Sequence, residues 1–260
     1  MPHAGSVAAG LRLAVGTLTV VPVGEIRPLP AGAGRVAMLL APVGALPVGV
    51  AAAAVLWLAT LIGVPPLVGA ALCVAAVAAS TRAMHLDGLA DTVDGFGGGW
   101  TRERALEIMR SGDVGPMGVA AMVLSLLVQA GSVAALATVP WAPLLVGVAV
   151  CVSRYAATVL CLRSVPAARG SGLGAVVAAS VPLPAALAGG VVWGGVLSAA
   201  AAAAGLPWWW GAAGVLAMIA ATGCLVAMAR RQIGGITGDV LGAGIEIALS
   251  VALVVLTVAA

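Results

Sequence analysis

The sequence predicts an all-α protein, a polytopic bundle of membrane helices, and three observations support this prediction. Hydrophobic residues make up 62% of the 260-residue chain, and charged residues only 8%. The mean hydropathy is +1.18. The apolar residues also form uncharged runs near the roughly 20 residues that a helix needs to cross a bilayer. A chain of this composition cannot cover a water-soluble globule with polar surface.

The apolar runs predict about seven spans, each bounded by turn residues or arginines. They cover residues 36–63, 66–84, 114–138, 141–162, 176–203, 208–229 and 241–259. A shorter run at 7–23 contains Arg12 and ends at Pro22, which favours an interfacial or re-entrant helix over an eighth span. Pro42 and Pro47 predict a kink in the first full span, because proline removes a backbone donor.

No linker is long enough to separate domains, so we expect one membrane-embedded domain over residues 1–260. The first residues lack the charged leader and cleavage site of a signal peptide. The cysteines lie in apolar runs, without the spacing of a disulfide framework or a metal site, and are expected to be small buried residues. They are Cys73, Cys151, Cys161 and Cys224.

Arginines occur in alternate loops, which predicts the orientation of the chain. The loops on one side contain Arg27 and Arg35, then Arg102, Arg104 and Arg110, then Arg163 and Arg169, and finally Arg230 and Arg231. The short turns on the other side, around Pro65, Pro140 and Pro207, contain none. By the positive-inside rule the arginine-bearing side faces the cytoplasm of a cell whose membrane holds the chain.

The segment His85-Leu-Asp-Gly-Leu-Ala-Asp-Thr-Val-Asp-Gly95 is the strongest functional signal. Six of the nine acidic residues lie between Asp87 and Asp113. Acidic side chains beside a bilayer are costly, so their concentration indicates a cation site. If the second span continues through this segment as a helix, Asp87, Asp91 and Asp94 share one face at i, i+4 and i+7. Carboxylate oxygens are ligands that magnesium or manganese selects. The alternative is a solvated helix end whose acids pair with Arg82, Arg102 and Arg104.

Glycines flank these acids and allow a ligand to approach the backbone closely, which suits phosphate or diphosphate. Thr101 is expected to cap a short helix in which Glu103, Glu107 and Arg110 form either part of the site or an exposed face. Asp113 follows closely enough to join the acidic site.

A second polar segment, residues 230–239, combines Arg230 and Arg231 with a glycine-rich turn and Asp239. Such a turn exposes N–H groups to an anion, while guanidinium groups bind its oxygens. Arg154 lies inside a predicted span and needs a buried partner. Glu246, also within a span, is either that partner or part of a polar cavity.

Two motifs resemble one known family. Residues 85–95, followed by Arg104-Ala-Leu-Glu-Ile-Met109 and Gly115-Pro-Met-Gly118, are similar to the first signature of cobalamin synthases, the adenosylcobinamide-GDP ribazoletransferases. Residues 234–243 resemble the second signature. The resemblance extends from Thr19 to Glu246, with small departures at Arg82 and at residues 97–99.

The resemblance implies a reaction in which adenosylcobinamide-GDP and α-ribazole, or its 5′-phosphate, give adenosylcobalamin, or its phosphate, and GMP. With Mg²⁺ as the expected cofactor, the predicted metal ligands are Asp87, Asp91, Asp94 and Asp239. The candidate bases are Asp94 and Asp113. The residues predicted to bind substrate are His85, Arg104, Arg154, Arg169, Arg230, Arg231 and Thr237.

The sequence also bears on the partners of the protein and on two alternative functions. The lipid bilayer is an expected partner, self-association is open, and no nucleic acid is expected. One alternative function is a CDP-alcohol-type membrane phosphotransferase, but no Ala-Arg pair follows Asp94-Gly95 as in that motif. The other is a cation transporter, which favours charges near the bilayer midplane, whereas this acidic cluster lies at the edge of a span.

Overall fold

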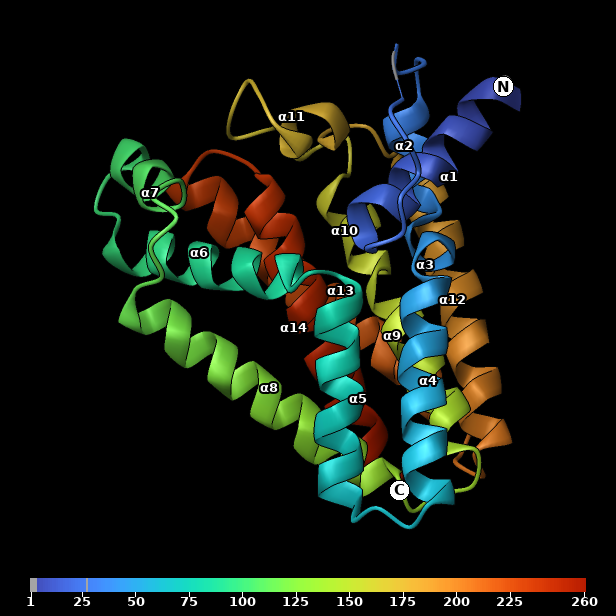
Figure 1. Cartoon of the computed structure of the whole chain (residues 1–260). Helices are drawn as coiled ribbons and strands as arrows, with labels where there is room; N and C mark the ends of the chain where they lie inside the picture. Colours follow the sequence, from blue (N-terminus) through green and yellow to red (C-terminus); the bar gives the residue numbers. More distant parts are fainter. Residues whose placement is uncertain (1–3, 27) are drawn as a thin grey trace.

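The computed structural model describes residues 4–26 and 28–260, and its regular elements are all helices (Figure 1). Arg27, which the orientation argument counted, lies outside the described residues. The helices are α1 Ala4–Leu18, α2 Ala33–Leu39, α3 Ala41–Gly44, α4 Leu46–Leu61, α5 Pro66–Ser80, α6 Met84–Gly98, α7 Arg102–Ile108, α8 Pro116–Leu136, α9 Ala142–Ser153, α10 Tyr155–Leu160, α11 Leu173–Val177, α12 Leu183–Ala203, α13 Trp209–Gln232 and α14 Gly238–Thr257.

The all-α membrane bundle predicted from the sequence is confirmed. Five helices among the described residues are long and apolar enough to cross a bilayer: α8, α9 joined to α10, α12, α13 and α14. A sixth crossing results if α5 and α6 are taken together. The number falls below the expected seven because α4 is a shorter apolar helix and α5 bends sharply into α6.

The first predicted span, 36–63, is divided into α2, α3 and α4. Pro42 lies in the first turn of α3 and Pro47 in the first turn of α4. Proline is tolerated in a first turn, where its missing N–H has no helical partner anyway. The predicted kink is therefore confirmed, and it takes the form of two helix restarts.

The turn between α5 and α6 corrects one prediction. The segment around Asp87 does not continue the second span, because α5 and α6 meet at 87°. Arg82 and Ala83, with φ angles of 53° and 55°, form the corner. Left-handed backbone at residues other than glycine costs about 1–3 kcal/mol each and persists only where the surrounding structure holds it. Figure 1 shows α6 lying across one end of the bundle, away from the direction of α5.

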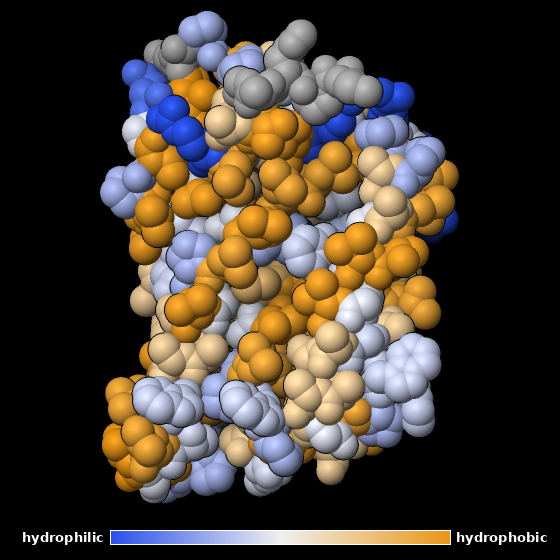
Figure 2. Space-filling view, turned by 90° about the vertical axis from the view of Figure 1, so that its right-hand side faces the viewer, coloured by the Kyte–Doolittle hydropathy of each residue, from blue (hydrophilic) through white to orange (hydrophobic). Residues whose placement is uncertain are grey.

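Polar and apolar surfaces are separated along the bundle. Figure 2 shows orange apolar side chains over the flank and blue hydrophilic residues gathered toward one end. The exposed apolar residues include Val50, Leu58 and Val191. Three of the cysteines are buried as expected, but Cys224 is exposed on α13, where it borders an open pocket with Phe96 and Met117.

Candidate active site

The crossing of α6 and α14 brings the two polar segments of the sequence together, and glycine makes it possible. A Cβ atom on Gly88 would lie 2.7 Å from the carbonyl oxygen of Asp239. A Cβ atom on Gly242 would lie 3.1 Å from Cα of His85. Both helices therefore approach to backbone contact, and the N-terminus of α14 is held beside the acidic face of α6.

Asp87, Asp91 and Asp94 all lie within α6, so the predicted spacing along one helix is realised. Their exposure differs: Asp87 is exposed, Asp91 is half-buried and Asp94 is buried. On this helix outside the spans, partial burial and the charges of Asp87, Asp239 and Asp94 raise the pKa of Asp91 to about 6, while Arg169 opposes the shift. The acids of the two segments thus form one electrostatic cluster.

Asp94 has structural partners for both of its carboxylate oxygens. The Gly115 N–H donates to one at 2.7 Å and the Gly118 N–H donates to the other at 2.8 Å. These are free N–H groups at the start of α8, where a carboxylate is favourable. A Cβ atom on Gly118 would lie 2.2 Å from the Asp94 carboxylate, so the first turn of α8 needs glycine there. The roles of Asp94 as metal ligand and base remain predictions, but the carboxylate already anchors α8 to α6.

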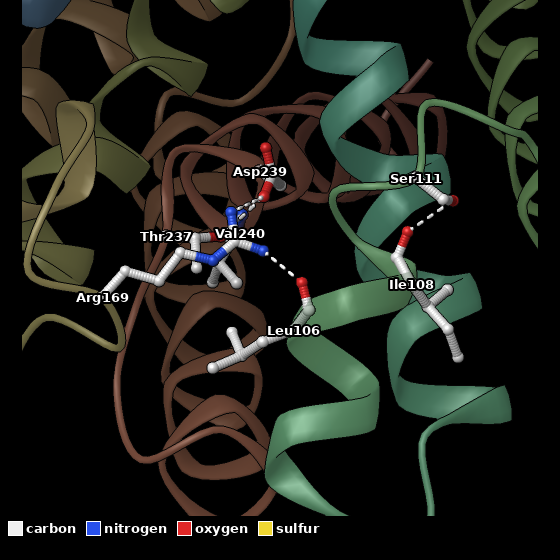
Figure 3. A network of polar contacts seen from close by, with 7 residues as sticks. All are labelled: Leu106, Ile108, Ser111, Arg169, Thr237, Asp239 and Val240. Carbon is white, nitrogen blue, oxygen red and sulfur yellow. Dashed lines mark hydrogen bonds and ion pairs between the residues drawn. The ribbon is translucent and has the colours of Figure 1, made fainter.

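Asp239 lies in the first turn of α14, next to Thr237 and Arg169 (Figure 3). The Thr237 hydroxyl donates to Oδ2 of Asp239 at 3.0 Å and accepts from the Val240 N–H at 3.3 Å. Nη1 of Arg169 lies 3.7 Å from the same Oδ2. Burial lowers the pKa of Arg169, and the charge of Asp239 counteracts this. Thr237 therefore both caps the start of α14 and orients the Asp239 carboxylate.

Two arginines join α7 to the loop that carries Arg169. Arg102 donates through Nη2 to the carbonyl of Ala168 at 3.0 Å and through Nε to the carbonyl of Ile233 at 2.9 Å. Arg169 donates in return from Nη2 to the carbonyl of Leu106 at 2.9 Å, as Figure 3 shows. These contacts, which we call the arginine clasp, fix α7, the 166–169 loop and the end of α13 to one another.

Backbone bonds complete the same junction. The Ala168 N–H donates to the Ile236 carbonyl at 2.8 Å, and the Ile236 N–H donates to the Pro166 carbonyl at 2.9 Å. A Cβ atom on Gly235 would lie 2.2 Å from that Pro166 oxygen. Glycine at 235 is thus required for the two loops to pair.

A cavity of about 290 Å³ opens where these elements meet. Its polar wall consists of Asp87, Asp239, Thr237, Arg169 and Ser171. Its other wall is apolar or glycine, with Met84, Leu173, Ile236, Ala175, Gly172, Gly174 and Gly238. The cavity therefore presents carboxylates and a guanidinium to one end of a ligand and hydrocarbon to the other.

Two predicted substrate-binding residues lie deeper than this cavity. His85 is 4% exposed and Arg154 is fully buried at the junction of α9 and α10. Nη1 of Arg154 donates to the Val150 carbonyl at 2.7 Å, and Glu246 interacts with Arg154 electrostatically. Glu246 also accepts from Nε2 of Gln129 at 2.7 Å. No ion pair joins these two side chains in the described part of the chain, and Nε and Nη2 of Arg154 have no hydrogen-bond partner there, so both readings of Glu246, as the partner of Arg154 or as part of a polar cavity, stay predictions.

The remaining predicted residues do not line the cavity. Arg104 forms an exposed ion pair with Glu107 at 2.7 Å, which fits the exposed-face reading of α7. Arg230 and Arg231 are exposed at the end of α13, and Asp113 is exposed between α7 and α8. Thr101 caps α7 as predicted, accepting from the Arg104 N–H at 3.2 Å. The substrate and base roles of these residues remain predictions.

The donor set suits a hard divalent cation by its chemistry, because Asp87 and Asp239 line the cavity and both interact electrostatically with Asp91. In the described part of the chain, no group of three or more Asp, Glu, His or Cys side chains is arranged to hold an ion with the side chains as they stand. Ligation by these carboxylates therefore requires side-chain rotation toward a shared point.

Sequence reasoning missed Arg102, and it missed the close contacts at Gly88 and Gly242. Arg102 looked like one of several loop arginines, and no local pattern marks a side chain that bonds to carbonyls 66 and 131 positions away. Gly88 and Gly242 do lie within the two motifs, so a signal existed: each motif places glycine on the helix face that carries or adjoins its aspartate.

Comparisons with known proteins identify the family of the chain. Residues 10–257 match the family described as cobalamin-5-phosphate synthase. A protein of a Nocardioides species, named adenosylcobinamide-GDP ribazoletransferase, is 45% identical over 93% of this chain and 95% of its own. Proteins with the same name from Bradyrhizobium diazoefficiens and Corynebacterium efficiens are 40% and 35% identical, over 92% and 99% of this chain and 89% and 94% of their own. No solved structure matches the chain. The sequence and its relatives together show that the chain belongs to the cobalamin-5-phosphate synthase family.

Proposed function

We propose that this protein joins adenosylcobinamide-GDP to α-ribazole, or to its 5′-phosphate, in a late step of cobalamin biosynthesis. A ribose hydroxyl attacks the cobinamide-side phosphorus of the diphosphate. A new P–O bond forms, the bond to the GMP oxygen breaks, and GMP leaves with the electron pair. The hydroxyl proton passes to a base. The products are adenosylcobalamin, or its phosphate, and GMP.

The observation that carries this proposal is the junction of α6, α14 and the Arg169 loop around one cavity. Phosphoryl transfer needs positioning and neutralisation of phosphate charge more than covalent chemistry from the protein. Arg169 supplies a planar guanidinium fork for phosphate oxygens, a recognition that such forks favour. The N-terminus of α14, capped by Thr237, adds a partial positive charge at the same edge.

Magnesium is the expected cofactor, with Asp87, Asp91 and Asp239 as the residues that would hold it. When bound, the cation neutralises charge on the transferring and leaving phosphates. Its binding would also relieve the mutual repulsion of the three carboxylates, which a protein pays for in stability when no cation is present. Asp94, bound to the N–H groups of α8, serves mainly to hold α6 in place.

The names of the relatives favour a transferase over the two alternatives. A CDP-alcohol phosphotransferase lacks support in the motif around Asp94. A cation transporter is disfavoured because such a protein favours charges near the bilayer midplane, whereas three of the acids lie on α6, which turns away from α5 by 87°.

We also propose that the site faces the cytoplasm of a multi-pass cell-membrane protein. Arg102, Arg169 and Arg230 belong to loops or helix ends on the side of the bundle that carries α6 and α7. The positive-inside rule assigns that side to the cytoplasm. Cysteines placed at the exposed positions Gly98 and Arg231 should then react with an impermeant reagent from the cytoplasmic side only, and a cysteine at Pro140 from the other.

A turnover assay of the purified protein in nanodiscs tests the activity. Adenosylcobinamide-GDP, α-ribazole and Mg²⁺ should give stoichiometric GMP and adenosylcobalamin, and a chelator should stop the reaction. GMP formation without α-ribazole, or activity that the chelator leaves intact, would contradict the proposed transfer or its cofactor respectively.

A further inference from the structure

An open apolar groove of about 370 Å³ lies between α6 and α13. The helix α14 packs against both of them and also contributes to the lining. At the surface the groove is bordered by Met117 and Met228, which are 50% and 49% exposed, and by the exposed Cys224. Because α13 is long and apolar enough to span a bilayer, this groove is open to the lipid around the bundle.

The acids of α6 and the groove lie on different sides of that helix. Leu89, Val93 and Phe96 line the groove. At about 100° per residue, these three positions lie within roughly 60° of one another, and Asp87 and Asp91 lie about 150–190° from their middle. A helix with one acidic side and one apolar side suits the boundary between water and hydrocarbon, with its apolar side turned to acyl chains. The groove is where α6 presents that apolar side.

The dimensions of the groove match one hydrocarbon chain. On α13 its lining runs from Ala221 to Gln232, a rise of about 16 Å along the helix axis. This is about half of the roughly 30 Å hydrocarbon core, the depth of one leaflet. Over that length the volume corresponds to an average width of about 5 Å, whereas a helix with its side chains is about 10–12 Å across. An acyl chain therefore fits the groove, and a helix of a second protein does not.

The upper end of the groove carries groups that bind phosphate. Gln232 lines this end, and its side-chain amide can donate to phosphate oxygens. Arg231 is exposed and lies about 70° around α13 from the middle of the groove-lining stripe, whereas Arg230 lies about 170° away. A guanidinium forms charge-assisted hydrogen bonds to phosphate. In the proposed orientation this end lies at the cytoplasmic leaflet, where anionic lipids are concentrated.

We propose that the groove between α6 and α13 binds one acyl chain of an anionic phospholipid, whose phosphate is held by Arg231 and Gln232. The lipid fills the space beneath the apolar side of α6 and so supports the helix that carries the acidic cluster. This site does not depend on the proposed reaction, and it is tested by binding alone.

Native mass spectrometry of the full chain in detergent, with equal amounts of phosphatidylglycerol and phosphatidylcholine, measures the headgroup preference. The wild-type protein should bind phosphatidylglycerol about fivefold more tightly, which corresponds to about 1 kcal/mol for one arginine near an anionic lipid. Arg231→Gln should bring the two lipids to equal affinity. Arg230→Gln is the matched control, since it removes the same charge on the other side of α13, and it should keep the fivefold preference.

Cys224 locates the acyl chain. It is exposed while the other three cysteines are buried, so a bulky maleimide modifies it selectively on the folded protein. The modified protein should lose one bound phosphatidylglycerol. Ala221→Phe, which fills the groove, should have the same effect, whereas Ala220→Phe, at an exposed position of α13 outside the groove, should bind lipid as the wild type does.

Three results would overturn the site. One is equal affinity of the wild-type protein for the two lipids, or an equal loss of preference in Arg231→Gln and Arg230→Gln. Another is unchanged binding of phosphatidylglycerol after modification of Cys224, a result that does not depend on whether any variant folds. The third is a dimer in the same spectra that the modification abolishes without changing the bound lipid, which would assign the groove to a second copy of the chain.

Discussion

The acidic face of α6 and the interior around Arg154 both place charge near the bilayer, but they treat it in opposite ways. In the interior, Arg154 and Glu246 attract each other, and Gln129 adds a hydrogen bond to the carboxylate. On α6, partial burial and then the neighbouring carboxylates raise the pKa of Asp91 to about 6. A buried charge with an opposite charge nearby is compatible with a stable fold. Several like charges gathered on one helix instead favour the binding of an oppositely charged ligand.

The difference predicts that interior variants lose stability while variants of the acidic face lose activity. Thermal unfolding in detergent measures the stability of each variant, and steady-state turnover in nanodiscs measures its activity.

The largest effect is expected for Glu246→Leu. This change leaves the buried guanidinium of Arg154 without its compensating charge, and breaking a buried pair in this way typically costs about 3–5 kcal/mol. The unfolding midpoint should fall by many degrees, and the double variant Glu246→Leu with Arg154→Leu should recover much of it, because paired replacement by apolar residues is often tolerated. An unchanged midpoint in the single variant would show that the two charges do not depend on each other.

Asp91→Asn is expected to act on activity alone. The amide keeps the shape but removes a negative charge from the cluster, so turnover should fall by about 10²- to 10³-fold and the requirement for Mg²⁺ should rise. Asp87→Asn should likewise raise the requirement for Mg²⁺, and Asp94→Asn should in addition lower the unfolding midpoint, because an amide cannot accept from the N–H groups of both Gly115 and Gly118. Glu103→Gln, an exposed acid on α7, serves as the control. Normal turnover of all three Asn variants at limiting Mg²⁺ would refute the metal assignment.

Arg102→Ala tests the arginine clasp. Without its two hydrogen bonds the Arg169 loop loses its attachment to α7, and kcat/KM should fall by about tenfold. If Arg102 acts through Arg169, the double variant with Arg169→Ala should be no slower than Arg169→Ala alone. Arg102→Lys should give an intermediate value, since an ammonium cannot reproduce the planar fork. Additive losses would mean that Arg102 supports the fold without positioning Arg169.

The smallest effect is expected for Glu107→Gln. The ion pair between Arg104 and Glu107 is exposed, with side-chain exposures of 58% and 68%. Such pairs contribute about 0.2–1 kcal/mol at most. The unfolding midpoint and turnover should both stay near wild type, and a tenfold loss of turnover would move α7 from the exposed surface into the site.

Composition and apolar runs were sufficient to predict the helical bundle, because a bilayer restricts a spanning chain to few structures. The spacing of Asp87, Asp91 and Asp94 also predicted a shared helix correctly. The corner at Arg82 and Ala83 could not be predicted, since neither residue type favours left-handed backbone and tertiary packing imposes it.

The sequence predicted the positions of the acidic residues of the candidate site better than those of its arginines. Asp87 and Asp239 come together because glycines in both motifs let α6 and α14 touch, and both motifs were visible in the sequence. Arg154 and Arg169 looked alike as isolated arginines, yet one is enclosed by the bundle and the other lines the cavity. Burial depends on long-range packing, which charge and spacing do not report.

The right-angled corner between α5 and α6 has a consequence for how such an enzyme meets its substrates. If α6 lies flat at the water boundary, as we propose for the site, a bulky, charged cofactor precursor can reach it without dissolving in lipid. The membrane would then serve to hold the enzyme in one plane, and both reactants would reach it by diffusion.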